Sequence, residues 1–333
     1  MIDAAIPKRS EALLSKARKI VCICHRGPDG DAVGALLGIA GLLEKRFPDA
    51  EVSMHCVDAV PETFHFLPNV LRVQGAPDLS DVSSTAAVVV DCGEPKMTEL
   101  HVSHPMLFDG TVPLVNIDHH QGNPAFGTEN CIDVSASSAC EIIADMAEAL
   151  GWEIDSDIAT CLLTGIYTDT GGLLHSNTTS KVYRTVSRLL RSGARSQQIV
   201  SAVFRTAKLS TLRLWGRVLE KIGITEEQGA ISAVTEADFR ATGADPAELT
   251  GAIDYLNAVP GMRFSLILSE REGKVKGSLR TLRDDVDVAA MAGRLSGGGH
   301  RKAAGFALPG RLKQETRWKV VDGPPAKDQQ ESQ

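Results

Sequence analysis

The strongest constraint on the fold is a recurring unit in which an apolar run ends at acidic or histidine residues before a helical pattern begins. The first unit has the apolar run 20–24, the polar segment His25-Arg26-Gly27-Pro28-Asp29-Gly30-Asp31 and a helical pattern over 32–47. This order predicts a strand, a turned loop and a helix. Further strands are predicted at 51–57, 86–90 and 113–117, and further helices at 138–150 and 155–168. The alternation favours an α/β fold with a largely parallel sheet.

The acidic and histidine residues of this region gather where the predicted elements end. Ligands of parallel sheets bind at the carboxyl ends of the strands, so we expect these side chains to share one site. They are His25, Asp29 and Asp31 after the first strand, Asp91 after 86–90, Asp118, His119 and His120 after 113–117, and Asp169 at the end of an apolar segment. Each cluster alone is also typical of a turn or a helix cap, but the joint pattern favours a common site.

Four of these residues are carboxylates that would repel one another strongly without a counter-charge: Asp29, Asp31, Asp91 and Asp169. Two divalent cations would balance them, and a bridging carboxylate would hold the ions roughly 3.5–4 Å apart. Such a pair lowers the pKa of a bridging water, so that hydroxide exists near neutral pH, and it clamps phosphoryl oxygens during in-line attack. Oxygen and nitrogen ligands without thiolates favour Mn²⁺ over Zn²⁺. The sequence therefore predicts two divalent cations, with Mn²⁺ favoured.

The motifs also occur in a specific order along nearly the whole chain. They are His25-x-x-Pro28-Asp29-Gly30-Asp31-Ala32, Asp91, Asp118-His119-His120, Thr168-Asp169-Thr170-Gly171 and Ser296-Gly297-Gly298-Gly299-His300-x-x-Ala303-Ala304-Gly305. The first four resemble the DHH phosphoesterase superfamily, and the last resembles the GGGH motif of its DHHA1 domain. Within that superfamily, the length and domain order are similar to the nanoRNase/pAp-phosphatase (NrnA-like) branch.

This resemblance implies a role for each residue of the predicted site. His25, Asp29 and Asp91 would hold one cation, and Asp31, Asp91, His119 and Asp169 the other, with Asp91 as the bridge. His120 would face the scissile phosphate as an electrostatic stabiliser or general acid, and Asp118 would orient a ligand or a nearby backbone group. The chain departs from the family pattern at Cys24, where small polar residues are commoner, and after Asp169, where an aromatic residue is frequent.

The pattern changes in the second half of the chain. Residues 181–222 are mostly helical in pattern, 230–239, 263–272 and 274–282 alternate like strands, and 247–258 and 287–295 are typical of helices. We therefore predict a parallel-sheet catalytic domain and a smaller α/β DHHA1 domain joined by a helical connector. The predicted bounds are 1–190 for the catalytic domain, 191–224 for the connector, 225–310 for the DHHA1 domain and 311–333 for a polar, mobile tail.

The GGGH segment and the basic residues near it are predicted to bind the substrate. Glycines let backbone N–H groups approach a phosphate closely, and residues 251–310 carry nine basic and six acidic residues. The predicted substrate-binding residues are Arg280, Gly297, Gly298, Gly299, His300, Arg301 and Lys302. A glycine run alone is more typical of a turn, and several of the basic residues also fit solvated strand faces. A domain that acts as an end stop would favour short substrates over long polymers.

Composition limits the partners and the compartment. A net charge of −7 disfavours long duplex nucleic acid, which needs a continuous basic surface. An odd count of seven cysteines, without an apolar signal-peptide core at the start, predicts a reducing cytoplasm. No apolar run reaches about 18 residues, so no membrane span is expected. Cys22-x-Cys24-His25 could bind zinc through its thiols and imidazole. Packing of the two cysteines in the core is the favoured interpretation, because free cysteines are among the most buried residues. Homodimerisation is left open.

The predicted activity is metal-dependent hydrolysis of phosphate esters in short oligonucleotides (nanoRNA, releasing mononucleotides), in pAp (giving AMP and phosphate), or in both. The alternatives are a phosphodiesterase for linear dinucleotides such as pApA, a RecJ-like single-strand exonuclease and an inorganic pyrophosphatase. The GGGH segment disfavours the pyrophosphatase. A nucleotide-binding module without activity is the alternative from another class, and it predicts lost ligands, whereas none is lost here.

Overall fold

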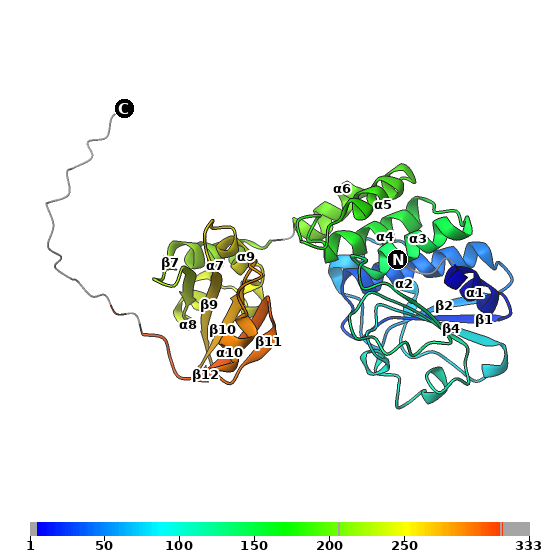
Figure 1. Cartoon of the computed structure of the whole chain (residues 1–333), viewed down its shortest axis with the longest axis horizontal. Coiled ribbons are helices and arrows are strands. Elements are labelled where there is room, and N and C mark those ends of the chain that lie inside the picture. The colour runs from blue at the N-terminus through cyan, green and yellow to red at the C-terminus, as the bar shows by residue number, and fades with distance from the viewer. Residues whose placement is uncertain (1–4, 206, 314, 316–333) are drawn as a thin grey trace, which may run out of the picture. The chain divides into compact units, whose positions relative to one another are not determined.

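The computed structural model of the chain describes residues 5–205, 207–313 and 315. Contacts divide the chain into two units, Met1–Thr206 and Ala207–Gln333, both drawn in Figure 1. The first unit contains α6 (Ser196–Ile199), and the second begins with α7 (Leu209–Glu220). Most of the tail predicted to be mobile, 311–333, lies outside the described residues.

The first unit is built on a six-stranded parallel sheet with the order β3-β2-β1-β4-β5-β6. Its strands are β1 (Lys19–Ile23), β2 (Glu51–His55), β3 (Val73–Gln74), β4 (Thr85–Val90), β5 (Leu114–Asp118) and β6 (Glu129–Ile132). The chain moves outward from β1 to β3 and then returns to place β4 on the other side of β1. In a doubly wound sheet of this kind, ligands bind at the carboxyl ends of the strands beside the point of reversal. The predicted α/β fold with a parallel sheet is confirmed.

Both faces of this sheet are buried, which explains why its strands are apolar without alternation. Val88 and Val90 of β4 pack in a larger core, whereas Ala87 and Val89 pack in a smaller core together with Leu100 and other residues of the 79–112 segment. The larger core is formed with the helices that Figure 1 shows beside the sheet. They are α1 (Ala5–Leu14), α2 (Gly30–Arg46), α3 (Ala139–Leu150), α4 (Ser156–Asp169) and α5 (Ser180–Arg191).

Glycines allow α2 and α4 to pack at very short range. A Cβ atom on Gly34 would lie 2.4 Å from the carbonyl oxygen of Cys161, and one on Gly38 would lie 2.5 Å from Leu162 Cδ2. On the facing helix, a Cβ atom on Gly165 would lie 2.5 Å from Asp31 Oδ1. Larger residues at these positions would push the helices apart, so the glycines bring α4 against the first turn of α2.

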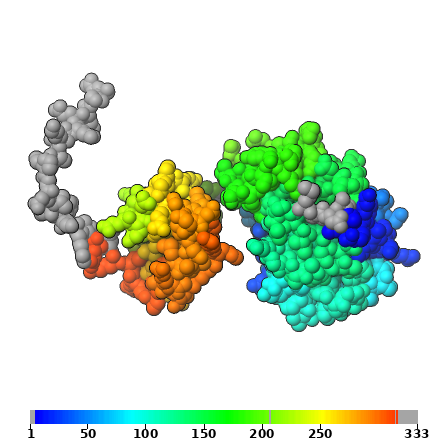
Figure 2. All heavy atoms as spheres, viewed as in Figure 1, coloured from blue at the N-terminus to red at the C-terminus, as the bar shows by residue number. Residues whose placement is uncertain are grey.

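The second unit has a six-stranded sheet with the order β11-β12-β10-β9-β8-β7, in which β8 and β9 are parallel and the other pairs are antiparallel. Its strands are β7 (Gly223–Ile224), β8 (Gly229–Val234), β9 (Phe264–Arg271), β10 (Lys274–Arg280), β11 (Gly298–His300) and β12 (Ala303–Pro309). Its helices after α7 are α8 (Glu236–Thr242), α9 (Ala252–Asn257) and α10 (Val288–Gly293). Figure 2 shows that the orange segment with β10, α10 and β11 forms much of the visible face of this unit. The predicted second α/β domain is confirmed.

Three local predictions were wrong. The first helix covers Ala5–Leu14, whereas the sequence pattern EALLSKAR predicts a helix at 11–18, and Pro7 is tolerated in its first turn. The strand predicted at 230–239 ends at Val234, because Thr235 and Asp238 form a capping box that begins α8. The single helix predicted at 247–258 is interrupted at Gly251, whose φ of 89° is left-handed.

The cysteines lie in the interior of the first unit. All seven cysteines are buried free thiols, and Cys22 and Cys24 pack in the larger core. Within the described residues, no helix combines the length and apolar character needed to cross a bilayer.

Candidate metal centre

Three strand ends at the reversal of the sheet bring two histidines to opposite oxygens of one carboxylate. His25 follows β1, Asp91 follows β4 and His119 follows β5. His25 Nε2 lies 3.5 Å from Asp91 Oδ2, and His119 Nε2 lies 3.5 Å from Asp91 Oδ1. A carboxylate flanked in this way is a candidate bridge between two cation positions.

The remaining predicted ligands complete two groups around this bridge. His25, Asp29 and Asp91 form one group, and Asp31, His119 and Asp169 form another, with potential ligand atoms within 4.8 Å of one another in each. His119 Nε2 lies 3.4 Å from Asp169 Oδ2 and 3.8 Å from Asp31 Oδ2. The structure thus brings together all six residues that the sequence analysis placed in the metal site.

Asp91 combines three features that fit a cation ligand. Its φ of 54° lies in the left-handed region, which is uncommon for residues other than glycine and is often found at functional sites. Its side chain is only 2% exposed. Its Oδ1 atom is buried and has no hydrogen-bond partner among the residues that the structure describes. A buried oxygen without a partner is costly, and a bound cation would satisfy it.

Two of the carboxylates are fixed by backbone N–H groups at helix starts. Asp31 is fully buried, and its Oδ2 and Oδ1 accept hydrogen bonds from the N–H groups of Ala139 (2.6 Å) and Cys140 (3.0 Å) at the start of α3. Asp29 Oδ1 caps α2 by accepting from the N–H groups of Asp31 and Ala32, both at 3.0 Å. Each carboxylate oxygen has two lone pairs, so a capped carboxylate keeps the capacity to bind a cation.

The protein charges of the site are out of balance without cations. Burial and the charge of Asp91 raise the pKa of Asp31 to about 7, and burial with the charges of Asp31 and Asp91 raises the pKa of Asp169 to about 8. Burial opposes the charged forms of His25 and His119, but Asp91 raises the pKa of each to about 9. Protons therefore balance the carboxylates in the metal-free protein, and divalent cations would displace them.

His120 points one ring nitrogen at Asp118. The Nδ1 atom of His120 lies 2.8 Å from Asp118 Oδ1 and 3.6 Å from Asp91 Oδ1. His120 also belongs to a third group of residues that could hold a cation, with Asp91 and His119. Because Nδ1 is engaged by Asp118, the other ring nitrogen is the one left for a ligand or substrate.

Two family models match the chain: the DHH family, N-terminal domain, over residues 19–166, and the DHHA1 domain over residues 227–322. The bifunctional oligoribonuclease and PAP phosphatase NrnA of Thermus thermophilus is 33% identical over 302 residues, which cover 90% of this chain and 87% of that protein. The chain belongs to the DHH family.

Other similar proteins agree with this family. NrnA of Mycoplasma pneumoniae, also described as a bifunctional oligoribonuclease and PAP phosphatase, is 29% identical over 295 residues, 87% of each chain. The solved structure of an exopolyphosphatase-related protein from Bacteroides fragilis has a TM-score of 0.80 at 24% identity, covering 94% of this chain and 93% of that one. That structure shows the same fold along nearly the whole DHH protein.

The GGGH segment of the DHHA1 domain is part of a strand rather than an open loop. Residues Gly298–His300 form β11 and pair with β12. A Cβ atom on Gly297 would lie 2.2 Å from the carbonyl oxygen of Gly305, and one on Gly299 would lie 2.6 Å from that of Ala303. Close approach of the two strands is therefore one reason for these glycines, independent of any substrate.

The basic residues beside this hairpin differ in whether they pair with an acidic residue. Arg301 Nη2 donates to the carbonyl oxygen of Asp284 at 2.7 Å, and Lys302 Nζ lies 2.8 Å from Asp284 Oδ1. Arg280 Nη1 donates to the carbonyl oxygen of its neighbour Leu279 at 2.9 Å. His300 is exposed. Arg301 and Lys302 thus hold the hairpin to the loop with Asp284, whereas Arg280 carries a charge without an opposite charge among the described residues.

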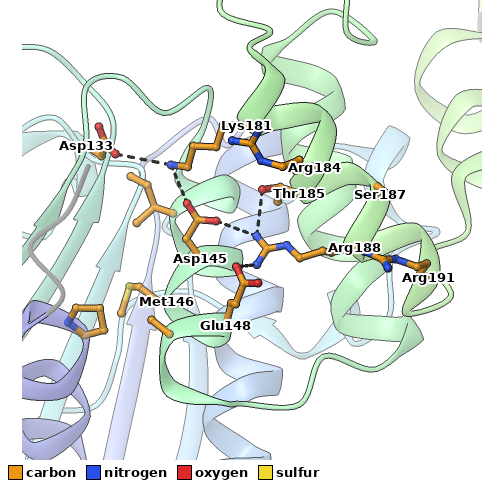
Figure 3. Close-up of a pocket in the computed structure, with 13 residues that line it drawn as sticks. Asp133, Asp145, Met146, Glu148, Lys181, Arg184, Thr185, Ser187, Arg188 and Arg191 are labelled. Carbon is orange, nitrogen blue, oxygen red and sulfur yellow. Dashed lines mark hydrogen bonds and ion pairs between the residues drawn. The ribbon is translucent and has the colours of Figure 1, made fainter.

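A separate groove of the DHH domain, with a volume of about 570 Å³, lies between α3 and α5. Lys181 Nζ lies 2.7 Å from Asp145 Oδ2, and Arg188 pairs with both Asp145 and Glu148, as the dashed lines in Figure 3 show. None of the residues that line this groove belongs to the candidate metal groups. Helix packing, reinforced by these ion pairs, explains the groove.

Adding Mn²⁺ to this DHH protein should raise its thermal stability. At about 100 times the Kd, binding to the folded state alone contributes about 2.7 kcal/mol, or a rise in Tm of about 5–10 °C for a unit of this size. Differential scanning calorimetry with and without Mn²⁺ measures this shift. The Asp91→Asn variant serves as the control, and an equal shift in that variant would place the stabilising ion elsewhere.

Proposed function

We propose that this DHH protein is a two-metal phosphoesterase that hydrolyses short oligoribonucleotides to mononucleotides and removes the 3′-phosphate of pAp. The central observation is Asp91, whose two oxygens each face a histidine of a different cation group. The similarity to NrnA proteins, which are described as bifunctional oligoribonucleases and PAP phosphatases, supports this choice of substrates.

Each residue of the metal centre has a role in this proposal. His25, Asp29 and Asp91 hold one cation, and Asp31, Asp91, His119 and Asp169 hold the other, with Mn²⁺ as the favoured ion. Bound as a pair, the cations supply a water nucleophile at neutral pH and neutralise charge on the phosphoryl group. His120 is the residue of the chain that stabilises or protonates the departing oxygen, and Asp118 holds its ring.

The DHHA1 domain supplies the substrate contacts in this proposal. Arg280 and the hairpin residues bind the phosphate and nucleotide that are not being cleaved. The hairpin residues are Gly297, Gly298, Gly299, His300, Arg301 and Lys302. The free charge of Arg280 supports its role as a phosphate contact, since hydrogen bonds to charged groups are strong.

Arg280→Ala should raise KM for pAp about 10–100-fold, because a hydrogen bond to a charged group contributes about 1.5–3 kcal/mol. Hydrolysis of bis(p-nitrophenyl) phosphate, which lacks a second phosphate, should change much less. Lys274→Ala is the matched control, since Lys274 is an exposed basic residue at the start of β10. A similar loss on both substrates, or a similar loss in the control, would remove Arg280 from substrate binding.

The function is tested by one assay panel with Mn²⁺. The substrates are pAp, pApA, a five-nucleotide RNA, an RNA several times longer and pyrophosphate, each with Asp91→Asn as the inactive control. Turnover of pAp and the short RNA in preference to the long RNA supports the proposal. Preference for pApA alone would favour a dinucleotide phosphodiesterase, preference for the long RNA a RecJ-like exonuclease, and no turnover a binding module.

A further inference from the structure

Asn123, in the loop after β5, has both ends of its side-chain amide engaged in the metal centre. Its Nδ2 donates to Asp118 Oδ2 at 2.6 Å and to the carbonyl oxygen of Cys92 at 3.1 Å. Its Oδ1 accepts from the Nδ2 of Asn116 at 3.1 Å and from the N–H of Ala125 at 2.9 Å. Because a carboxylate only accepts hydrogen bonds, the Asp118 contact fixes which end of the amide is the nitrogen.

The Asp118 carboxylate joins Asn123 to His120. Asp118 is fully buried, and its two oxygens accept from Asn123 Nδ2 and from His120 Nδ1. The proton shared with Asp118 therefore lies on Nδ1, which leaves Nε2 of the 43% exposed His120 ring without a partner among the described residues. A buried carboxylate with one oxygen unpaired could rotate, and the imidazole would turn with it.

The second donor contact of Asn123 links two strand ends. Cys92 is the residue after Asp91, so the Asn123–Cys92 hydrogen bond ties the loop that follows β5 to the loop that follows β4. Asn116 on β5 is fully buried, and its Nδ2 donates a hydrogen bond to Asn123 Oδ1. The amide is thus held from both sides, and in turn it holds Asp118 at a fixed place relative to Asp91.

We propose that Asn123 is a positioning residue that fixes the ring orientation and tautomer of His120 through Asp118. This inference deepens the proposed function and rests on it for the kinetic consequences. Removing a hydrogen-bond partner that orients a functional histidine typically lowers affinity or activity about 10–100-fold. Within the described part of the chain, the Asn123 side chain makes no hydrogen bond to the side chain of a predicted cation ligand, and in the proposed mechanism it does not touch the substrate.

The kinetic test is a double-mutant cycle on pAp with saturating Mn²⁺. Asn123→Ala should lower kcat about 10–100-fold, with KM and Mn²⁺ affinity unchanged. The same substitution in the His120→Ala background should have almost no further effect, because its target is absent. An equal factor in both backgrounds, or a loss of Mn²⁺ affinity, would overturn the proposal. Asn123→Leu, which fills the space with an apolar side chain that has no donor, should behave like Asn123→Ala.

Asn130→Ala is the matched control for this cycle. Asn130 bonds to Gly127 and, at 3.4 Å, accepts from Asn116, but it makes no hydrogen bond to Asp118. Its replacement should leave kcat close to the wild-type value. A loss as large as that of Asn123→Ala would assign the effect to the loop as a whole and overturn the specific role of Asn123.

A second readout does not need activity and separates this inference from the proposed function. The ¹⁵N chemical shifts of the His120 ring report its tautomer in the metal-free protein. In the wild type, Nδ1 should stay protonated whether or not Nε2 carries a second proton, so that the neutral ring is the Nδ1–H tautomer, and Asn123→Ala should show a mixture of tautomers or a mobile ring once the ring is neutral. An unchanged spectrum in the variant would overturn the inference, whereas absent wild-type turnover with the expected spectra would overturn the proposed function alone.

Discussion

Asp91→Ala is expected to lower kcat/KM for pAp about 10⁴-fold, which corresponds to about 5.4 kcal/mol of lost transition-state stabilisation. Asp91 belongs to the His25 group, and its Oδ1 atom lies 3.5 Å from Nε2 of His119, a member of the second candidate group. Its removal therefore impairs both positions together rather than one. Because the change deletes a buried charge from a cluster of carboxylates, the fold should remain, as circular dichroism would show.

Asp91→Asn separates the loss of charge from the backbone effect. Asparagine tolerates the left-handed conformation that position 91 adopts, whereas alanine does so at a cost of about 1 kcal/mol. Both variants should be inactive, and the asparagine variant should keep more of the thermal stability. If Asp91→Asn retained activity within about tenfold of the wild type, the bridging role of Asp91 would be wrong.

His120→Ala should lower kcat about 10²–10⁴-fold while the protein still binds Mn²⁺, because a positioned acid–base group typically contributes a factor of this size. Isothermal titration calorimetry measures the Mn²⁺ affinity, and steady-state kinetics on pAp measures kcat. The neighbouring variant His119→Ala is the comparison, since His119 faces Asp31, Asp91 and Asp169 and should be needed for cation binding. A loss of Mn²⁺ affinity in His120→Ala as large as that in His119→Ala would make His120 a ligand.

The sequence predicted the parallel sheet because its strands are buried on both faces and therefore stand out as apolar runs. It also pointed to the carboxyl ends of β1, β4 and β5, where the topology brings His25, Asp91 and His119 together. Which residues share a cation group depended on family resemblance, since distances across the sheet are not encoded in spacing. By proximity, His25, Asp29 and Asp91 form one group, Asp31, His119 and Asp169 form another, and Asp91, His119 and His120 form a third. The assignment of ligands to cations stays a prediction.

Other features depended on tertiary contacts that no local pattern contains. Asn123 follows the Asp118-His119-His120 motif by three residues. Its proposed role depends on a hydrogen bond to Cys92, which follows a different strand and cannot be predicted from spacing. Gly165 was hidden in a helical pattern, although it is what lets α4 approach Asp31. The start of α8 was missed because the capping box at Thr235 and Asp238 outweighed the apolar alternation before it.

The glycine contacts between α2 and α4 also have a consequence for the order of events on the ribosome. Every other predicted ligand emerges before α4, and Asp169 emerges last, at the end of that helix. The second group of candidate ligands, Asp31, His119 and Asp169, is complete only when α4 packs against Gly34 and Gly38 of α2. A chain that stops before α4 would lack Asp169, so we expect that cation binding by the second group requires α4 to be made and packed against α2.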